Sequence, residues 1–253
     1  MLVTVKAYPQ LSDVGESVCV AGIDLEERSW IRLYPLPFRD LPRPAQFNKY
    51  ATIDVRTKKS GFDSRRESYV PDFDSISVVA PPLPAGRWTR RKKVVLPLAE
   101  EIMCEIYRRP GDERPSLGMF RPAAPPRLVI QERRRRDWSE GKQMTIDQGR
   151  MLLPEKAPLQ FIPYRFKYAY SCRAEGCNGH EQTIVDWEIS QAFRAWTKEK
   201  GEERALSDIR TKWEEKMWDG RETYLYTGNQ LAHRRAFLVL GVFWPPASRG
   251  GTP

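Results

Sequence analysis

Three residues of types that bind zinc lie close together in the second half of the sequence. Cys172, Cys177 and His180 fall within one short segment, and glycines at 176 and 179 favour a tight turn there. Thiolates and imidazoles are ligands that zinc prefers, so the segment predicts a structural zinc site. The alternative is two reduced thiols that bind no metal. A closed site needs a fourth ligand, and the candidates are His233, Asp186, Glu188 and Cys104.

The acidic pair Asp186 and Glu188 follows this segment in the sequence IVDWE. If zinc kept an open position, it would activate water with Glu188 as the general base, as in a metal-dependent nuclease or hydrolase. The simpler interpretation makes Asp186 the N-cap of a helix and places Glu188 in its first turn, where both satisfy free backbone amides and the helix dipole. The pattern favours the capping role, and Asp186 and Glu188 stay the catalytic candidates of the enzyme alternative.

Basic residues alternate with aromatic ones in several segments. Lys and Arg number 42 against 33 Asp and Glu, a net charge of +9, and residues 81–140 supply most of that excess. Arginine and lysine neutralise phosphates, and aromatic rings stack on bases, so nucleic acid is the expected partner. The opposing interpretation is that aromatic residues on strands form core and that charged runs are solvated surfaces. The candidate nucleic-acid contacts are Trp30, Arg32, Tyr34, Arg87, Arg90, Arg91, Lys92, Lys93, Arg133, Arg134, Arg135, Arg136, Arg165 and Lys167.

Short strands separated by turn residues characterise residues 1–80. Apolar alternation and β-rich runs predict a small barrel. Residues 35–48 contain four prolines, so we expect a loop there rather than a regular strand or helix. Five strands with one long connection fit an OB-like barrel, although an SH3-like barrel has the same pattern. The predicted strands are 2–7, 17–23, 30–34, 50–57 and 75–80.

The rest of the chain divides into a connector and a second β-rich region. The pattern of residues 81–126 predicts that this segment is a basic, proline-rich connector with a short helix around 98–108. Residues 127–246 predict a second OB-like module with strands at 127–131, 161–170, 224–226 and 237–243. Apolar residues at helical spacing predict a helical insertion over 187–218, broken at Gly201. Residues 247–253 predict a frayed tail.

Composition excludes several classes of protein. Hydrophobic residues make up 40% of the 253, which is enough for a core and too much for a wholly disordered chain. No apolar run is long enough to cross a membrane and the N-terminus has no signal-peptide pattern, so we expect a cytoplasmic protein with no membrane partner. Four unevenly placed cysteines predict reduced thiols rather than a disulfide framework.

Several sequence segments resemble, in the same order along the chain, a family of bacterial proteins described as carrying a dual OB-fold domain. They are WIRLYPLPFRDL with QFNKY, SLGMFRP, FKYAYSCRAEGCNGHEQTIVDWE and YTGNQLAHRRAFLVLGVFWPP, which together span nearly the whole chain. The resemblance implies two tandem OB-like barrels, nucleic-acid binding and occurrence beside prokaryotic conflict or defence systems, with no catalytic activity assigned. It supplies no roles for the matching positions, and Arg234 stands where a proline is expected. Those positions are Trp30, Arg32, Tyr34, Pro35, Cys172, Cys177, His180, Asp186, Trp187, Glu188, Gly228, Asn229 and His233.

The sequence therefore predicts a mainly β protein with two OB-like modules that binds single-stranded or structured DNA or RNA within a defence or mobile-element system. The first alternative is the nuclease or hydrolase centred on Asp186 and Glu188. The second is a protein-interaction adaptor whose basic surface faces an acidic partner.

Overall fold

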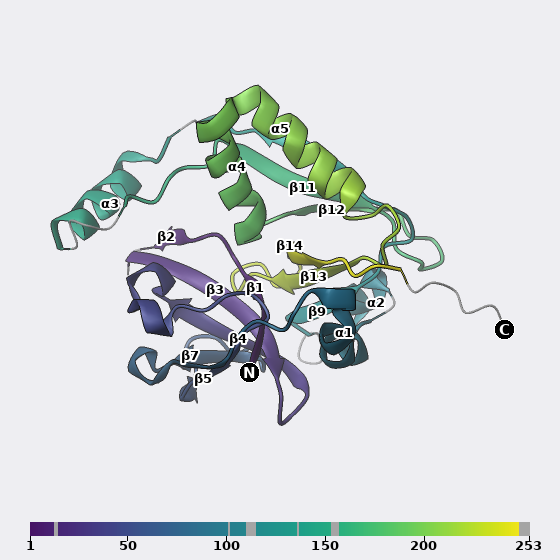
Figure 1. The fold of residues 1–253 in the computed structure, drawn as a ribbon, viewed down its shortest axis with the longest axis horizontal. Coiled ribbons are helices and arrows are strands. Elements are labelled where there is room, and N and C mark those ends of the chain that lie inside the picture. The colour runs from purple at the N-terminus through teal and green to yellow at the C-terminus, as the bar shows by residue number, and fades with distance from the viewer. Residues whose placement is uncertain (13–14, 101, 110–114, 136, 153–156, 248–253) are drawn as a thin grey trace.

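The computed structural model describes residues 1–12, 15–100, 102–109, 115–135, 137–152 and 157–247. The fold is mainly β, as predicted, with one large curled sheet, two small sheets and a layer of helices (Figure 1). The strands are β1 (Leu2–Lys6), β2 (Gln10–Ser12), β3 (Gly15–Asp24), β4 (Ser29–Leu36), β5 (Thr52–Asp54), β6 (Thr57–Lys59), β7 (Ser68–Pro71), β8 (Ser77–Ala80), β9 (Leu117–Phe120), β10 (Arg127–Glu132), β11 (Tyr164–Tyr170), β12 (His180–Thr183), β13 (Tyr224–Asn229) and β14 (Phe237–Phe243). The helices are α1 (Thr89–Val95), α2 (Met103–Arg108), α3 (Glu140–Leu152), α4 (Trp187–Lys200) and α5 (Glu202–Arg210).

The large sheet contains every strand from β1 to β8, so the first 80 residues build it alone. Its order is β6-β7-β4-β3-β1-β5-β8, with β2 added beside β3. The pairs are antiparallel except β4 with β7. Buried β-branched and leucine side chains on its concave side form a core with Phe38 and Phe47 from the long loop. The loop was predicted from residue 35, but β4 continues through Pro35 to Leu36, and the remainder of the loop contains two 3-10 turns, in agreement with its other prolines.

The second region consists of two three-stranded sheets. Their orders are β10-β11-β12 and β14-β13-β9, and a bridge between Ile184 and Val239 joins them. Strand β9 comes from the predicted connector and pairs with β13. The sequence pattern missed β9 because its LGMF is short and lies between a basic segment and prolines.

Helices form over the segment predicted to be helical, 187–218, and they cover one face of the β10-β11-β12 sheet (Figure 1). Helix α4 ends and α5 begins at Gly201, whose φ of 85° is a conformation that glycine adopts without strain. A π-helical turn, Thr211–Lys216, continues α5 and buries Trp213 completely. The predicted helix around 98–108 is shorter in the structure, since α2 starts at Met103 and Leu98 lies in a 3-10 turn containing Pro97.

The two regions share a core. Leu2 and Val5 of β1 pack with Tyr226 of β13 and Phe243 of β14 in one buried cluster, which also includes Trp88. Because residues from both halves of the chain bury the same apolar surface, each half is stabilised by the other. Of the predicted frayed tail, residues 248–253 lie outside the described residues.

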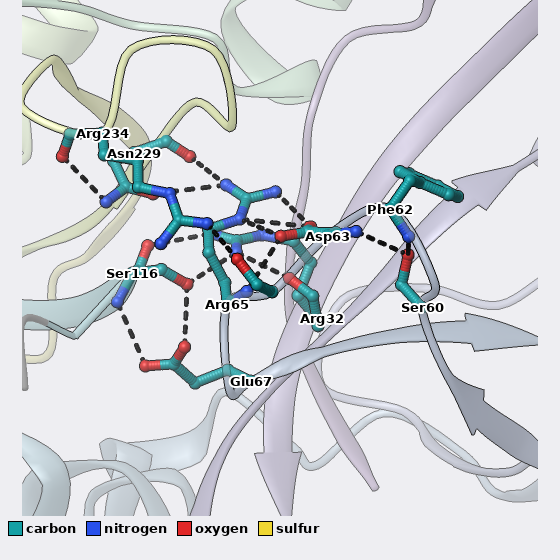
Figure 2. Close-up of polar contacts among 11 residues, drawn as sticks. Arg32, Ser60, Phe62, Asp63, Arg65, Glu67, Ser116, Asn229 and Arg234 are labelled. Atoms are coloured by element: carbon teal, nitrogen blue, oxygen red, sulfur yellow. Dashed lines mark hydrogen bonds and ion pairs between the residues drawn. The ribbon is translucent and has the colours of Figure 1, made fainter. Parts of the chain in front are cut away.

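A buried polar network also joins the regions (Figure 2). The Arg32 guanidinium donates to the Ser116 hydroxyl at 2.6 Å and to the Ser116 carbonyl at 2.8 Å. Ser116 donates its backbone amide and its hydroxyl to the Glu67 carboxylate at 3.1 and 2.9 Å. Beside it, the Arg65 guanidinium donates through Nε and Nη2 to both carboxylate oxygens of Asp63 and, at 2.7 Å, through Nη1 to the carbonyl of Asn229. Each buried charge in this network is therefore matched by hydrogen bonds, as burial requires.

Candidate metal centre and basic pocket

Cys104, Cys172, Cys177 and His180 bring four ligand atoms together. The Nε2 atom of His180 lies 3.5 Å from the Cys104 sulfur and 3.4 Å from the Cys177 sulfur. The Cys172 and Cys177 sulfurs are 3.6 Å apart, and the four atoms all lie within 4.8 Å of one another. This cluster can hold a metal ion.

Two elements far apart in the sequence position these ligands. Cys104 lies in the first turn of α2, while Cys172 and Cys177 lie in the loop between β11 and β12, and His180 begins β12. The loop turns back through Gly176 and Gly179, whose φ angles are 68° and 89°. Those left-handed conformations are strained for other residues, which explains the glycine spacing in the sequence.

The surroundings of His180 fix its ring. Tyr107 stacks parallel to the imidazole at 5.7 Å between ring centres, and Tyr170 lies against it at 5.2 Å. Burial lowers the pKa of His180, which favours the neutral imidazole that metals bind. Burial raises the pKa of the Cys104 thiol to about 12, with the neighbouring Cys172 and Cys177 adding to the shift. A cation at the centre would oppose that shift, because the thiolate is the form that coordinates metal.

Of the four candidates for a fourth ligand, Cys104 is the one that lies in the cluster, and His233 does not. His233 is exposed in the turn before β14, and the metal cluster found among the described residues does not include it. Asp186 and Glu188 are also outside the cluster. Sequence spacing gave no signal for Cys104, because its partners come 68 or more residues later and only the tertiary fold brings them together.

Asp186 caps α4, as the simpler interpretation predicted. Its Oδ1 accepts the backbone amide of Glu188 at 3.0 Å. The Asp186 side chain is buried, and burial raises its pKa to about 7 against the opposing charge of Lys49. Glu188 is exposed on the first turn of α4 and lies 3.6 Å from the Lys49 ammonium.

A basic pocket lies where β10, α3 and the segment before β11 meet. Its volume is about 470 Å³, and its lining combines cationic and aromatic side chains with two carboxylates, those of Glu132 and Asp137. Trp138 and Phe161 meet edge to face at 5.0 Å between ring centres, and both also line the two neighbouring pockets. The Arg133 guanidinium lies 5.7 Å from the Phe161 ring centre and the Lys142 ammonium 5.8 Å from that of Trp138. The cations that line the pocket are Arg133, Arg134, Arg135, Lys142 and Arg165.

Four of the predicted nucleic-acid contacts meet in this pocket, namely Arg133, Arg134, Arg135 and Arg165. Sequence analysis did not single out Trp138, Phe161 or Lys142. Trp138 follows the arginine run closely in the sequence, which was an available signal, whereas nothing in the sequence around Lys142 of α3 indicated that it lines the pocket.

Arg32 was predicted to contact nucleic acid, and its burial contradicts that prediction. Its side chain is about 2% exposed and donates to Ser68 and Ser116, so it serves the interior network and cannot reach a nucleic acid (Figure 2). Its neighbours Trp30 and Tyr34 are half-buried, and Trp30 packs edge to face on Tyr226.

The remaining predicted contacts differ in exposure. Arg90 and Lys93 of α1 are exposed, but Arg91 donates to the Leu83 carbonyl and Lys92 pairs with Glu222. Lys167 pairs with Glu181 at 2.8 Å. Nothing is described for the side chain of Arg87, and Arg136 lies outside the described residues.

No helix in the described parts of the chain has both the length and the apolar character needed to span a membrane. Comparison with curated proteins found no match, and comparison with solved structures found none either. Residues 1–97 match a family model described as Domain of unknown function (DUF8758). Residues 99–252, more than half of the chain, match the model described as Domain of unknown function (DUF8757), and the chain therefore belongs to that family.

Proposed function

We propose that the protein binds nucleic acid at the basic pocket. The observation that carries this proposal is the pocket's lining, in which Trp138 and Phe161 lie among the guanidinium and ammonium groups of five cationic residues. Arg134 and Arg135 are exposed at the pocket, where a ligand can reach them. Phosphates would bind these cations, and bases would stack on the two rings.

Single-stranded segments fit this lining better than a duplex. In a duplex the base faces are already stacked, so an aromatic pair in a pocket reaches them only in loops, ends or single strands. The pocket of about 470 Å³ lies against two further pockets that share Trp138 and Phe161, which provides a continuous path for neighbouring nucleotides. This continuity supports binding through backbone charge and stacking rather than base-specific hydrogen bonds.

The charge reversal Arg134→Glu with Arg135→Glu tests the proposal. The matched control reverses two exposed cations of the first region, Arg43→Glu with Lys58→Glu, so that both proteins carry the same net charge. We expect the pocket variant to bind a labelled single-stranded oligonucleotide at least about tenfold more weakly, with the slope of log affinity against log salt reduced by about 1.4. Fluorescence anisotropy at several salt concentrations measures both quantities. Equal losses in the two variants would show that net charge alone drives binding, and would reject the pocket as the site.

We further propose that the four-residue cluster holds a structural zinc ion. A tetrahedral zinc with ordinary bond lengths separates two sulfurs by about 3.8 Å and a sulfur from a nitrogen by about 3.6 Å. The separations of 3.6, 3.5 and 3.4 Å in the cluster match those edges closely. Three cysteines and one histidine complete the coordination and leave no open position for substrate, which favours a structural over a catalytic metal.

Metal analysis of the purified protein tests the zinc proposal. We expect about one zinc per chain in protein prepared without added metal, and loss of most of it in Cys104→Ser. Cys19→Ser is the matched control, because Cys19 is a free cysteine outside the cluster. Zinc content that is unchanged in Cys104→Ser would show that this residue is not a ligand.

We also propose that the protein contains two OB-like modules and acts within a prokaryotic defence system. The curled sheet of β1 to β8 supports an OB-like architecture for the first region, and the two small sheets would form the second module. A role within a defence system follows from the family resemblance alone. No described residue joins Asp186 and Glu188 in a metal-binding cluster, so no observation favours the nuclease alternative.

A further inference from the structure

A smaller pocket adjoins the basic pocket and lies between the two regions, and we call it the inter-region pocket. Its volume is about 260 Å³. Residues 8–11, at the start of β2 and just before it, line it from the first region, and Ser190 of α4 lines it from the second. It shares part of its lining with the basic pocket, so one ligand can contact both. The shared residues are Arg133, Trp138, Lys142, Phe161 and Arg165.

Hydrogen bonds hold two tyrosines in the wall of the inter-region pocket. The Tyr8 backbone amide donates to the Val185 carbonyl at 2.8 Å, and the Tyr8 hydroxyl donates to the Gln160 carbonyl at 2.9 Å. Tyr164 of β11 donates its hydroxyl to the Glu202 carboxylate at 2.6 Å. Because these bonds form without a ligand, the two rings are already in place and binding costs little ordering.

The lining of the inter-region pocket is aromatic and cationic, and none of the described residues that line it carries a carboxylate. The basic pocket differs in this respect, since Glu132 and Asp137 line it. The charge of Arg165 adds to burial in lowering the pKa of Arg133, so the two guanidiniums repel each other. A phosphate beside them would relieve that repulsion. The aromatic residues of the lining are Tyr8, Trp138, Phe161, Tyr164 and Phe166.

The size and chemistry of the inter-region pocket fit one nucleobase. Sites for drug-sized ligands usually have volumes of about 300–1,000 Å³, so this pocket admits only a small group. Aromatic side chains stack on the planar face of a base, and the shared cations can hold the phosphate attached to it. A small apolar ligand would use the rings and leave the cations unmatched, whereas a nucleotide uses both.

We infer that the inter-region pocket holds one unstacked nucleobase of the strand whose phosphates bind the basic pocket. This inference rests on the proposed function and deepens it, because it restricts the substrate to strands in which a base can leave the stack. A base within a duplex must first be unpaired and unstacked, which costs free energy. Both regions line the pocket, so both contribute to binding.

Blocking the inter-region pocket without touching the basic pocket tests the inference. Ser190 is 7% exposed and lines this pocket but neither of its neighbours. Ser190→Leu fills space there with a residue that favours helix, while Ser190→Ala removes the hydroxyl and leaves the space open. We expect Ser190→Leu to bind a labelled oligothymidylate about tenfold more weakly, because one base loses its stacking contacts, and Ser190→Ala to bind it as the unmodified protein does. Fluorescence anisotropy measures these affinities.

An abasic strand of the same length separates the loss of a base site from damage to the basic pocket. It keeps the phosphates and has no bases, so the unmodified protein and both variants should bind it equally. Gln10→Trp blocks the pocket from the first region, with Gln10→Ala as its control, since the exposed Gln10 also lines only this pocket of the three. We expect the same tenfold loss, again confined to the strand that has bases.

Two results would overturn the inference. One is binding of oligothymidylate by Ser190→Leu and Gln10→Trp that equals binding by the unmodified protein. The other is an equal loss of affinity for oligothymidylate and for the abasic strand. Neither result contradicts the proposed function. That function fails, and the inference with it, if the unmodified protein binds neither strand or if reversing Arg134 and Arg135 has no more effect than the control reversal.

Discussion

Two sets of arginines have opposite environments in this protein. Arg32 and Arg65 lie inside the junction network, where serine, carboxylate and backbone oxygens take up their donors. Arg134 and Arg135 lie exposed at the basic pocket. The difference teaches that an arginine's role depends on whether acceptors from distant segments reach it. Those acceptors cannot be read from the residues beside it.

The largest expected effect is the loss of stability when a buried arginine of the interior network is removed. Arg65→Ala leaves Asp63 buried without its partner, and we expect the free energy of unfolding to fall by about 3–5 kcal/mol. The adjacent Arg66→Ala is the control, because the Arg66 side chain is 68% exposed and its 3.6 Å ion pair with Glu67 should contribute less than about 1 kcal/mol. Urea denaturation measures both. Similar losses in the two variants would contradict the distinction between interior and exposed arginines.

A smaller effect is expected from the aromatic part of the pocket. Trp138→Leu keeps apolar packing but removes a stacking surface, so affinity for a single strand should fall by about 1–3 kcal/mol. Trp30→Leu serves as the comparison, since Trp30 packs on Tyr226 in the shared core. We expect Trp30→Leu to alter stability and leave affinity unchanged, as measured by anisotropy on the folded protein. The reverse result would move the binding surface to the first region.

The smallest expected effect is a change with pH in the stability that Asp63 of the interior network contributes. Burial alone would raise the pKa of Asp63, but hydrogen bonds from Arg65 outweigh burial and lower it from 3.8 to about 2. A carboxyl whose pKa is lower in the folded state stabilises the fold above its unfolded pKa and loses this contribution as pH falls toward the folded value. The stability advantage of the unmodified protein over Asp63→Asn should therefore shrink between pH 4 and pH 2. Urea unfolding at several pH values checks this, and a constant difference across that range would contradict it.

Local patterns predicted much of the secondary structure. The alternation at 2–7, the β-rich run at 17–23 and the helical spacing after Asp186 each identified an element correctly. Each of these segments buries one face, and burial imposes a period on the sequence. Short elements such as β9 and β12 gave no such signal, because four residues are too few to establish a period.

The site residues were predicted where they are neighbours in sequence and missed where folding brings them together. Cys172, Cys177 and His180 share one loop and were found, whereas Cys104 arrives from α2. The arginines of residues 133–135 were found as a run, but Phe161 reaches them only across the pocket. Arg32 was misassigned, since its sequence neighbours Trp30 and Tyr34 gave no indication that Ser116 covers it.

The position of Cys104 has a consequence for how the chain folds. The link from Cys104 to His180 spans 76 residues, so a metal held by both closes a long loop without a disulfide. Cys172, Cys177 and His180 are close in sequence, whereas Cys104 reaches them only when α2 packs beside β12. The proposed zinc would therefore have all four ligands only in the folded chain, so that metal binding and the docking of α2 would stabilise each other.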